Sequence, residues 1–475
     1  MVLKRTEVLV VGCGISGSIA ALAAARNGAK TLVIDRQGQP GGNIGPGLFG
    51  GAPSLELPRT MEKGLPGIAG ELIGRCEELS GHEFPHNYFE DSQTFVYVLL
   101  KEYERYGVDA LFNVYAGDPL MEGRTIRGIH VETKQGREQI LADVVIDATG
   151  DADVVFRCGA PVDEGAGLFH PGMYFALANV DTQRYRKEAV GREPDAAVLS
   201  WGNDYIGMKT NPNLRFLFPY IKRAWEAERF PFVREVEGGR LFADHGLFFG
   251  VSGPSVVDPR KRESLGIAGA MVCFRGDRIP TSGDSVLMSR LEVEARKYIY
   301  EFAQFARRYV PGCADAYLHA SGSYFSSRGG RSMIARKALT EEDVEGSYTC
   351  DDAMFEGRSG IVPSNPLWSR HNDYRYSFQF PYRQFLPQNV EGLLATGRAC
   401  IVQKPQLRMR WQMFLTGEAA GTAAALSVKA RCLPSRIDVG ALRNILAAQG
   451  FPMGTGRPPV NGAFPDRLDD RDGEA

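Results

Sequence analysis

The sequence contains eight cysteines, but no two of them lie within five residues of each other. That spacing excludes the CxxC pairs of redox proteins and zinc ribbons, and the short cysteine runs of iron–sulfur proteins. No cysteine pair falls in residues 36–60, which argues against disulfide-reductase chemistry. Scattered single thiols are typical of a reducing compartment, so we expect a cytoplasmic protein whose cysteines mostly pack in the interior.

Long runs of one residue class are also missing. The formal net charge is −2 and no Lys/Arg run stands out, so the basic footprint of a nucleic-acid binder is lacking. No apolar stretch approaches the roughly 18 residues that a membrane-spanning helix needs. The apolar run Val8 to Val11 leads straight into a glycine turn, which is not the pattern of a signal peptide. We expect no nucleic-acid partner and no membrane span.

What the sequence does contain is a βαβ pattern at residues 6–35. Glu7 to Val11 predicts a buried strand, Ser18 to Asn27 an alanine-rich helix, and Lys30 to Asp35 a second buried strand. Between the first strand and the helix stands Gly12-Cys13-Gly14-Ile15-Ser16-Gly17. A GxGxxG motif in this context predicts dinucleotide binding, which the same letters elsewhere in a chain would not.

The glycines of this motif have separate tasks. Gly12 permits the tight turn, Gly14 lets the backbone approach a pyrophosphate, and Gly17 lets helix and strand pack closely. The helix N-terminus offers free N–H groups and about half a positive charge to the phosphates. Asp35 ends the second strand, where a carboxylate accepts hydrogen bonds from ribose hydroxyls and repels a 2′-phosphate. A second GxGxxG at residues 45–50 follows no strand and opens no helix, so we interpret it as a loop of small residues approaching the cofactor.

Further along the chain, two strands end in glycine turns, Val144 to Asp151 and Leu393 to Arg398. Both resemble the later flavin-contacting strands of the glutathione-reductase-like FAD superfamily. The whole chain resembles FAD-dependent oxidoreductases related to succinate dehydrogenase and fumarate reductase flavoproteins. The matching segments occur in the same order over nearly the whole chain: Pro40 to Asn43, Ile146 to Asp153, Arg290 to Pro311, Leu339 to Val344, Pro381 to Arg383, Gly397-Arg398 and Gly417 to Gly421.

The resemblance implies FAD as the cofactor and a set of contacts to it. We expect the FAD to be noncovalent, because no histidine occurs in residues 41–51, where some relatives attach the flavin. The helix after Arg408 is expected to direct its N-terminus at the flavin ring, where it stabilises negative charge on the reduced flavin. The predicted FAD contacts are Gly12, Gly14, Ile15, Ser16, Gly17, Asp35, Arg36, Gly42, Asn43, Val114, Gly150, Asp151, Gly397 and Arg398.

We therefore predict an α/β protein: a Rossmann-like FAD-binding domain with a β-meander, interrupted by an α+β substrate or cap domain. The FAD-binding domain is expected in residues 1–160 and 381–450, the substrate domain in 161–380, and a flexible tail in 451–475. The local patterns behind this division are a helix at 94–106, a three-stranded antiparallel meander at 110–142, a buried strand from Asp143, an amphipathic helix at 289–309, a strand at 392–396 and a helix at 411–430.

On the substrate side we looked for groups that bind a carboxylate or move a proton. Arginine suits bidentate capture of a carboxylate, and histidine suits acid–base catalysis. Arg328 and Arg331 would share a face if that stretch is helical. The alternative is a surface or domain-interface salt bridge for each arginine and for His371, and core packing for Tyr382. The candidates are Arg328, Arg331, His371, Tyr382, Arg408 and Arg410.

The chain departs from the family pattern near these candidates. Gly329-Gly330 stand where the family has an acidic and a hydroxyl residue between its two mid-chain arginines. The segment at residues 400–407 is short and offers Lys404 instead of a serine and a histidine. Both departures fall on the expected substrate side, so the family resemblance does not identify the substrate.

Three hypotheses for the function follow. The first is an FAD-dependent dehydrogenase or oxidase that acts on a small organic substrate. Substrates that bear a carboxylate are included in this hypothesis. The second is a flavin monooxygenase that uses NAD(P)H and oxygen, or a halogenase, although the Trp-x-Trp-x-Ile-Pro signature of halogenases is absent. The third is a non-catalytic or tRNA-modifying FAD protein. The sequence identifies neither the electron acceptor nor the oligomeric state, and a homo-oligomer remains open.

Overall fold

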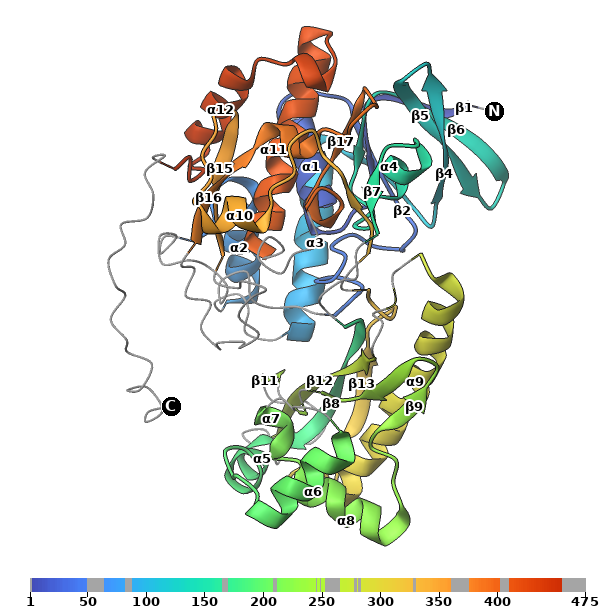
Figure 1. Ribbon diagram of the computed structural model, residues 1–475, viewed down its shortest axis with the longest axis vertical. Helices are drawn as coiled ribbons and strands as arrows, with labels where there is room; N and C mark the ends of the chain where they lie inside the picture. Colours follow the sequence, from blue (N-terminus) through green and yellow to red (C-terminus); the bar gives the residue numbers. More distant parts are fainter. Residues whose placement is uncertain are drawn as a thin grey trace.

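The computed structural model describes residues 2–48, 64–81, 88–164, 170–207, 212–244, 246–247, 249–252, 265–276, 280, 283–327, 330–359, 376–401 and 410–454. Within these residues two large β-sheets, each with its own hydrophobic core, lie one beyond the other along the long axis of the molecule (Figure 1). The described part contains no helix long and apolar enough to cross a membrane.

The first sheet has seven strands, in the order β3-β2-β1-β6-β5-β4, with β17 paired to β6. Strands β1, β2, β3, β6 and β17 pair in parallel, whereas β4 and β5 add an antiparallel extension to β6. The strand bounds are β1 Val2–Val11, β2 Thr31–Asp35, β3 Asp109–Phe112, β4 Tyr115–Glu122, β5 Thr125–Thr133, β6 Gly136–Asp147 and β17 Leu393–Ala395.

Strand β6 joins two parts of the fold that the sequence suggested were separate. Its first half pairs with β5 and alternates between exposed and buried residues, while its last residues are continuously buried between β1 and β17. One face of the meander meets solvent, but both faces of the parallel sheet are covered. The burial pattern along β6 therefore changes from alternating to continuous within one strand. The predicted third meander strand and the strand from Asp143 are therefore one element. Strand β3 belongs to the parallel sheet rather than to the meander.

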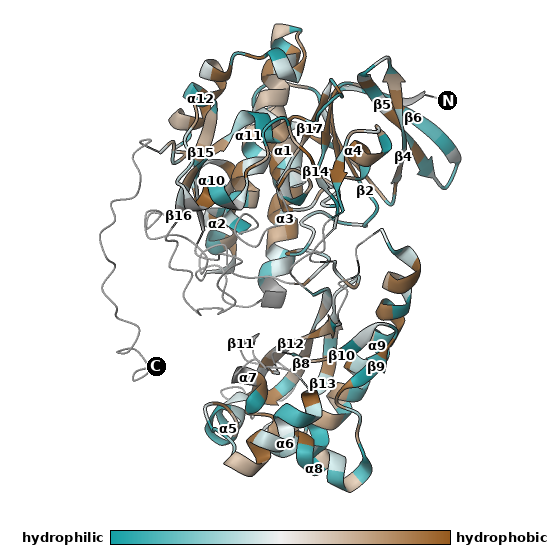
Figure 2. Ribbon diagram, viewed as in Figure 1, coloured by the Kyte–Doolittle hydropathy of each residue, from teal (hydrophilic) through white to brown (hydrophobic). Residues whose placement is uncertain are grey.

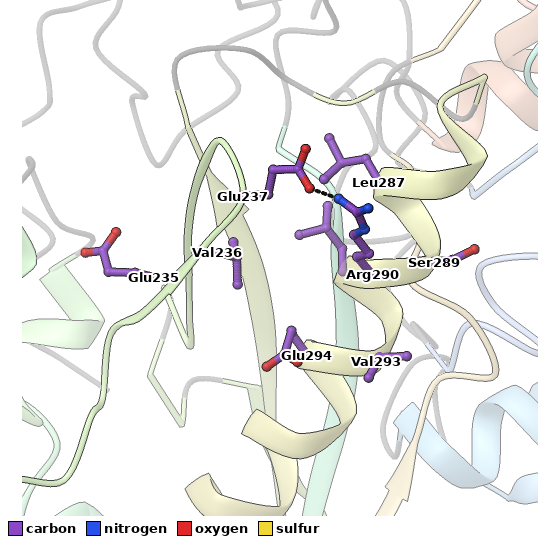
Figure 3. Close-up of a pocket in the computed structure, with 9 residues that line it drawn as sticks. Glu235, Val236, Glu237, Leu287, Ser289, Arg290, Val293 and Glu294 are labelled. Atoms are coloured by element: carbon purple, nitrogen blue, oxygen red, sulfur yellow. Dashed lines mark hydrogen bonds and ion pairs between the residues drawn. The ribbon is translucent and has the colours of Figure 1, made fainter.

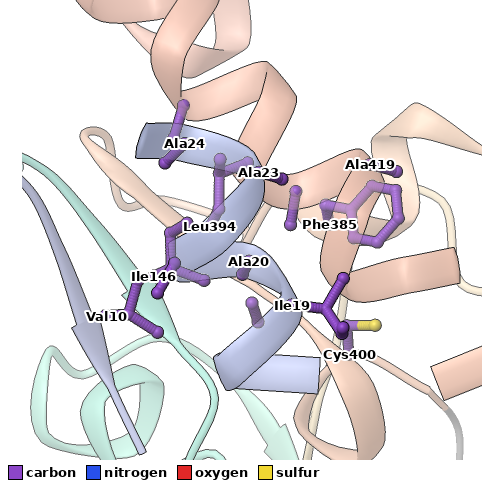
Figure 4. Close-up of a cluster of buried hydrophobic side chains, with 14 of the residues drawn as sticks. Val10, Ile19, Ala20, Ala23, Ala24, Ile146, Phe385, Leu394, Cys400 and Ala419 are labelled. Atoms are coloured by element: carbon purple, nitrogen blue, oxygen red, sulfur yellow. The ribbon is translucent and has the colours of Figure 1, made fainter. Parts of the chain in front are cut away.

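Helices cover the first sheet. Ala20, Ala23 and Ala24 of α1 pack between the sheet residues Val10 and Ile146 and the neighbouring helix α11 (Figure 4). The remaining elements of this half complete its core. The bounds are α1 Ile15–Arg26, α2 Gly67–Ser80, α3 Tyr88–Tyr106, α4 Asp153–Arg157, β7 Val162–Asp163, β14 Ser332–Met333, α10 Glu341–Glu345, β15 Ala353–Ser359, β16 Tyr376–Pro381, α11 Arg410–Ala430 and α12 Val439–Ala448.

Helices α1 and α11 approach each other closely enough for their backbones to touch. A Cβ added at Gly417 would lie 2.4 Å from the Ser16 carbonyl oxygen, and one at Gly421 would lie 2.1 Å from the Ala20 carbonyl oxygen. Only residues without a side chain fit at such distances. Because the contacts advance by the same four-residue step on both helices, the helices run parallel, with their N-termini at the same end.

The second sheet is antiparallel, in the order β13-β8-β12-β10-β9, with β11 paired to β12. Helix α9 packs the predicted apolar face Leu291, Ala295, Ile299, Phe302 and Phe305 against it and exposes hydrophilic residues on the other side (Figure 2). The bounds are β8 Gly172–Asp181, α5 Thr182–Glu188, α6 Ala196–Ile206, α7 Pro212–Arg215, α8 Phe218–Glu228, β9 Arg234–Val236, β10 Gly239–Phe242, β11 Phe249–Ser252, β12 Leu265–Arg275, α9 Ser285–Tyr309 and β13 Tyr317–Ser321.

The chain crosses between the two halves in two segments that lie side by side. Asp163 of β7 pairs with Ser332 of β14, and Gly172 forms an antiparallel bridge with Ser326. The second core contains residues from Met173 to Phe325, while buried residues after this range join the first core. The domain boundaries at residues 160 and 380 stay a proposal. The buried residues change from the first core to the second between Ala160 and Met173, and back to the first core between Phe325 and Met333.

A buried carboxylate fastens α2 to α1 and α11. Glu418 accepts hydrogen bonds from the Arg26 guanidinium (2.5 Å) and from the backbone N–H of Ile68 (2.8 Å), which lies in the first turn of α2. A carboxylate at a helix N-terminus satisfies an otherwise free N–H group. Burial raises the pKa of Glu418 to about 7, although Arg26 acts in the opposite direction.

The tight contact between α1 and α11 predicts the effect of a single methyl group. In Gly421→Ala the new Cβ would meet a backbone oxygen, so the helices must separate, at a cost of about 1–3 kcal/mol. Gly74 in α2 is the matched control, because a Cβ there would have no atom within 4 Å. Gly74→Ala should stabilise the protein by up to about 1 kcal/mol through helix propensity. Urea unfolding measures both variants, and equal changes in the two would contradict the packing argument.

The Glu418 network predicts a pH dependence of stability. The native state keeps a proton on Glu418 up to about pH 7, whereas the ordinary pKa of this carboxyl is 4.5. The unfolded chain binds fewer protons between these values, so the free energy of unfolding falls as the pH rises from 4.5 to about 7. Glu418→Gln removes this contribution. Unfolding curves measured across the window should be flatter for the variant, and identical pH profiles would locate the titration elsewhere.

Candidate cofactor and substrate site

The glycine motif after β1 forms a turn in which two of the three glycines have no space for a side chain and the third faces open space. A Cβ at Gly12 would lie 2.5 Å from the Ala148 carbonyl oxygen, and one at Gly17 would lie 1.9 Å from the Gly12 carbonyl oxygen. A Cβ at Gly14 would meet nothing within 4 Å. Gly14 is also the N-cap of α1, and it has no side chain to occupy the first N–H groups of the helix. The turn therefore has the room and the donors that a pyrophosphate requires.

Asp35 lies beside this turn at the end of β2. Its two carboxylate oxygens accept hydrogen bonds from the backbone N–H groups of Cys13 and Gln37, each at 2.7 Å. Val114, another predicted contact, donates its backbone N–H to the Asp35 carbonyl oxygen. Two backbone donors hold the carboxylate in place, while each oxygen keeps a lone pair for a ribose hydroxyl. Arg36 follows directly in sequence.

The second glycine-ended strand is held by a residue that the sequence reasoning did not single out. Asp147 ends β6 and accepts hydrogen bonds from the backbone N–H groups of Thr149, Val154 and Val155, as well as from the Thr149 hydroxyl. These bonds fix the turn at Gly150 and cap the start of α4. Burial raises the pKa of Asp147 to about 6, against the effect of the hydrogen bonds. Its signal in the sequence is the position directly before a glycine turn at the end of a buried strand.

The third glycine-ended strand meets both of the others. A Cβ at Gly397 would lie 2.5 Å from the Ser16 hydroxyl oxygen, so this turn contacts the start of α1. The Arg398 guanidinium pairs with the Asp151 carboxylate at 3.1 Å and donates to the Ser327 carbonyl oxygen at 2.7 Å. The structure thus brings predicted FAD contacts from three distant parts of the chain to one edge of the parallel sheet, next to the crossing to the second sheet.

The loop after β2 lies against the same turn. Gly42 has a φ of +51°, and a Cβ there would lie 2.8 Å from the Gly14 Cα atom. The close approach requires glycine, and it places Asn43, which is exposed, next to the phosphate-binding turn. Residues 45–48 of the second GxGxxG form neither strand nor helix, whereas residues 49 and 50 lie outside the described part.

Helix α11 extends past the start of α1. Gly417 faces Ser16, and Arg410 precedes Gly417 by about two helical turns. At 1.5 Å per residue, the start of α11 therefore lies about 10 Å beyond the phosphate-binding end of α1. Because the two helices are parallel, the positive end of the α11 dipole lies at the same end of the helix pair as Gly14, where it would favour negative charge on a bound cofactor.

The structure defines contacts for two of the catalytic candidates, Arg331 and Tyr382. Arg331 pairs with Asp153, and its guanidinium stacks 4.2 Å above the Phe156 ring. Tyr382 is buried and donates its hydroxyl to the Pro434 carbonyl oxygen at 2.7 Å. Arg331 leads into strand β14, so the helical face that it would share with Arg328 is not formed there. Contact of either side chain with a substrate stays a prediction.

The other candidates are less defined. Arg410 is the first residue of α11, at the end that extends past α1. Arg328, His371 and Arg408 lie outside the described residues, so their roles stay predictions. In the described part of the chain, no group of three or more Asp, Glu, His or Cys side chains is arranged to hold a metal ion.

The side of the second sheet that meets the FAD-binding half is apolar. Strand β8 alternates, with Met173, Phe175 and Leu177 in the second core and Tyr174 and Ala176 on the opposite face. Leu48, Ile267 and Ala320 pack against these two residues. Leu48 belongs to the loop that carries Asn43. This loop therefore contacts both the phosphate-binding turn and the apolar face of the second sheet.

A separate surface pocket lies between α9 and the β9–β10 hairpin (Figure 3). Arg290 pairs with Glu237 at its rim, and Leu287, Val236 and Val293 line it. None of the predicted FAD contacts or catalytic candidates belongs to its lining. This pocket is therefore separate from the predicted cofactor site at the glycine-ended strands.

The two-donor arrangement around Asp35 gives a test. In Asp35→Asn the single amide oxygen can accept from only one of the two backbone N–H groups. The amide NH₂ group then faces the second N–H group, so the side chain no longer holds two acceptors for the ribose hydroxyls. We expect at least about a tenfold weaker binding of FAD, measured by flavin fluorescence, because one charged hydrogen bond is worth about 1.5–3 kcal/mol. Asp109→Asn, at an exposed Lys4 pair, is the control. Unchanged affinity in Asp35→Asn would exclude a ribose contact.

Comparison with known proteins identifies curated relatives at modest identity. A vinyl phenol reductase of Lactiplantibacillus plantarum is 22% identical over 286 residues, which cover 52% of this chain and 58% of that protein. The digeranylgeranylglycerophospholipid reductase 3 of Methanosphaera stadtmanae is 49% identical over 41 residues, 9% of this chain and 10% of that protein. The matched part is therefore less than two thirds of the length of either relative.

Comparison with solved structures identifies similar chains at low identity and with TM-scores below 0.5. A geranylgeranyl bacteriochlorophyll reductase-like protein of Thermoplasma acidophilum is 13% identical with a TM-score of 0.41, covering 94% of this chain and 84% of that one. A myxobacterial chondrochloren halogenase is 14% identical with a TM-score of 0.40, covering 93% and 78%. The family model described as FAD dependent oxidoreductase matches residues 7–446. The chain belongs to the FAD dependent oxidoreductase family, and FAD is its cofactor.

Proposed function

We propose that this protein is a dehydrogenase or oxidase that moves a hydride or electrons between noncovalent FAD and a small organic substrate. The observation that carries the proposal is the position of the apolar face of the second sheet. It lies directly beyond the loop after β2, which packs against the phosphate-binding turn, and Leu48 of that loop packs on Tyr174 and Ala176. A surface so close to the cofactor is where a substrate wall is expected.

The residues of the chain have distinct tasks in this proposal. Bound FAD supplies the redox chemistry. Asp35 holds the ribose through the oxygens that Cys13 and Gln37 orient. The free N–H groups at the start of α1 hold the pyrophosphate. The start of α11 places positive potential near the ring end of the site, which favours negative charge there.

The face also bears on the kind of substrate. Its described residues are tyrosine, alanine, isoleucine and leucine, which suit an apolar body rather than several charged groups. Arg331 and Arg398 are engaged by Asp153 and Asp151, so neither supports a carboxylate site in the described residues. Capture of a substrate carboxylate therefore stays a prediction for Arg328 and Arg408, which lie outside the described residues. Both curated relatives are named as reductases, which supports including the reductive direction.

Anaerobic photometric titration tests the redox proposal. The oxidised holoprotein is titrated with a panel of aromatic and aliphatic donors with and without carboxylates, and the reduced holoprotein with unsaturated acceptors. We expect bleaching or recovery of the flavin absorption with at least one apolar member. If no member reacts while NAD(P)H is consumed together with oxygen, the protein is a monooxygenase, and the proposal is wrong.

A variant at the apolar face tests the substrate wall. Ala320 is partly buried and packs against this face, so Ala320→Phe should fill space next to it and raise the KM about tenfold or more, with FAD binding unchanged. His319→Phe introduces the same ring at the exposed neighbouring position and is the control. Equal KM values for the two variants would place the substrate elsewhere.

A further inference from the structure

The loop that carries Asn43 is docked onto the second half of the molecule. Ser323 donates both its backbone N–H (2.9 Å) and its hydroxyl (3.0 Å) to the carbonyl oxygen of Pro46. A Cβ at Gly322 would lie 3.1 Å from the Gly47 carbonyl oxygen. The second GxGxxG motif of the sequence thus supplies the small residues through which the FAD-binding half meets the segment after β13.

The same segment holds the side chain of Asn43. The Tyr324 hydroxyl donates to Asn43 Oδ1 at 3.1 Å, and the Ser326 hydroxyl lies 3.3 Å from the same oxygen. The Ser326 hydroxyl is also 3.3 Å from the Ser327 carbonyl oxygen, so its proton is shared between two acceptors. Both hydroxyls come from the segment where the chain leaves the second sheet and returns to the first.

Tyr324 stands between the two sides of the FAD site. The charged groups that act on its hydroxyl are Arg36 and Asp35 from the end of β2, and Arg398 and Asp151 from the later glycine turns. All four belong to the predicted FAD contacts. Burial raises the pKa of Tyr324 to about 12, so its hydroxyl keeps its proton at neutral pH and can donate to Asn43.

We propose that Tyr324 and Ser326 are positioning residues for FAD, which hold Asn43 Oδ1 so that the amide nitrogen of Asn43 faces the cofactor. A carboxamide has one oxygen acceptor and two N–H donors on opposite branches. With the oxygen turned to the second half, the donors are free for a phosphate or carbonyl oxygen of FAD. Asn43 lies directly after Gly42, whose backbone touches the phosphate-binding turn. The second half of the molecule therefore orders a cofactor contact without supplying it.

The experiment measures FAD dissociation from the full-length holoprotein by flavin fluorescence. Tyr324→Phe should raise the Kd about five- to tenfold, the change expected for one hydrogen bond. Ser326→Ala should raise it less, because its hydroxyl divides its proton between two acceptors. Ser323→Ala is the matched control, since it removes a hydroxyl from the same docking segment without touching Asn43, and its Kd should stay within about twofold of the wild type.

A double-mutant cycle separates positioning from general stability. In the Asn43→Ala background, Tyr324→Phe should cause no further loss, because Tyr324 acts through Asn43. Asn43→Asp keeps an acceptor for both hydroxyls but removes the amide donors, so it should bind FAD as weakly as Asn43→Ala. Additive losses in the cycle, a Ser323→Ala loss equal to that of Tyr324→Phe, or wild-type affinity in Asn43→Asp would each overturn the proposal. Ser326→Ala supplies the cycle if Tyr324→Phe does not fold.

Discussion

The close contact between α1 and α11 is the constraint on which the rest of the site depends. Helix backbones that touch at Gly417 and Gly421 leave no freedom in the relative height of the two helices. That height fixes how far the start of α11 extends beyond the phosphate-binding end of α1. It also brings the Gly397 turn against Ser16. The cofactor site is therefore defined by two segments separated by most of the chain and joined by glycines.

Local patterns were enough to predict the elements that are determined locally. The first βαβ unit, the apolar face of α9 and the strand before Gly397 were predicted because burial on one or both faces leaves a period in the sequence. Helix α2 was not predicted, because its start is capped by Glu418, a carboxylate distant in the chain. The join between the meander and the parallel sheet in β6 was missed for a similar reason, since only pairing partners show that the strand is continuous.

The candidate site shows the same difference between features that are determined locally and features that depend on distant residues. The glycine turn after β1 was predictable from a motif, and the structure places Asp35 beside it, while the contacts of both with FAD stay predictions. A long side chain has several partners within reach, so sequence cannot decide between a substrate and a neighbour. Arg331 pairs with Asp153, and Tyr382 bonds to Pro434. Tyr324 was missed because nothing near it in sequence shows that it meets Asn43.

The two crossings between the halves lie side by side, joined by the pairing of Asp163 with Ser332 and the bridge between Gly172 and Ser326. An insertion that leaves and returns at one point can be replaced during evolution without disturbing the strands that bind the nucleotide. Any such exchange would have to keep the contacts beside the crossings, where Ser323 donates to Pro46 and Tyr324 donates to Asn43.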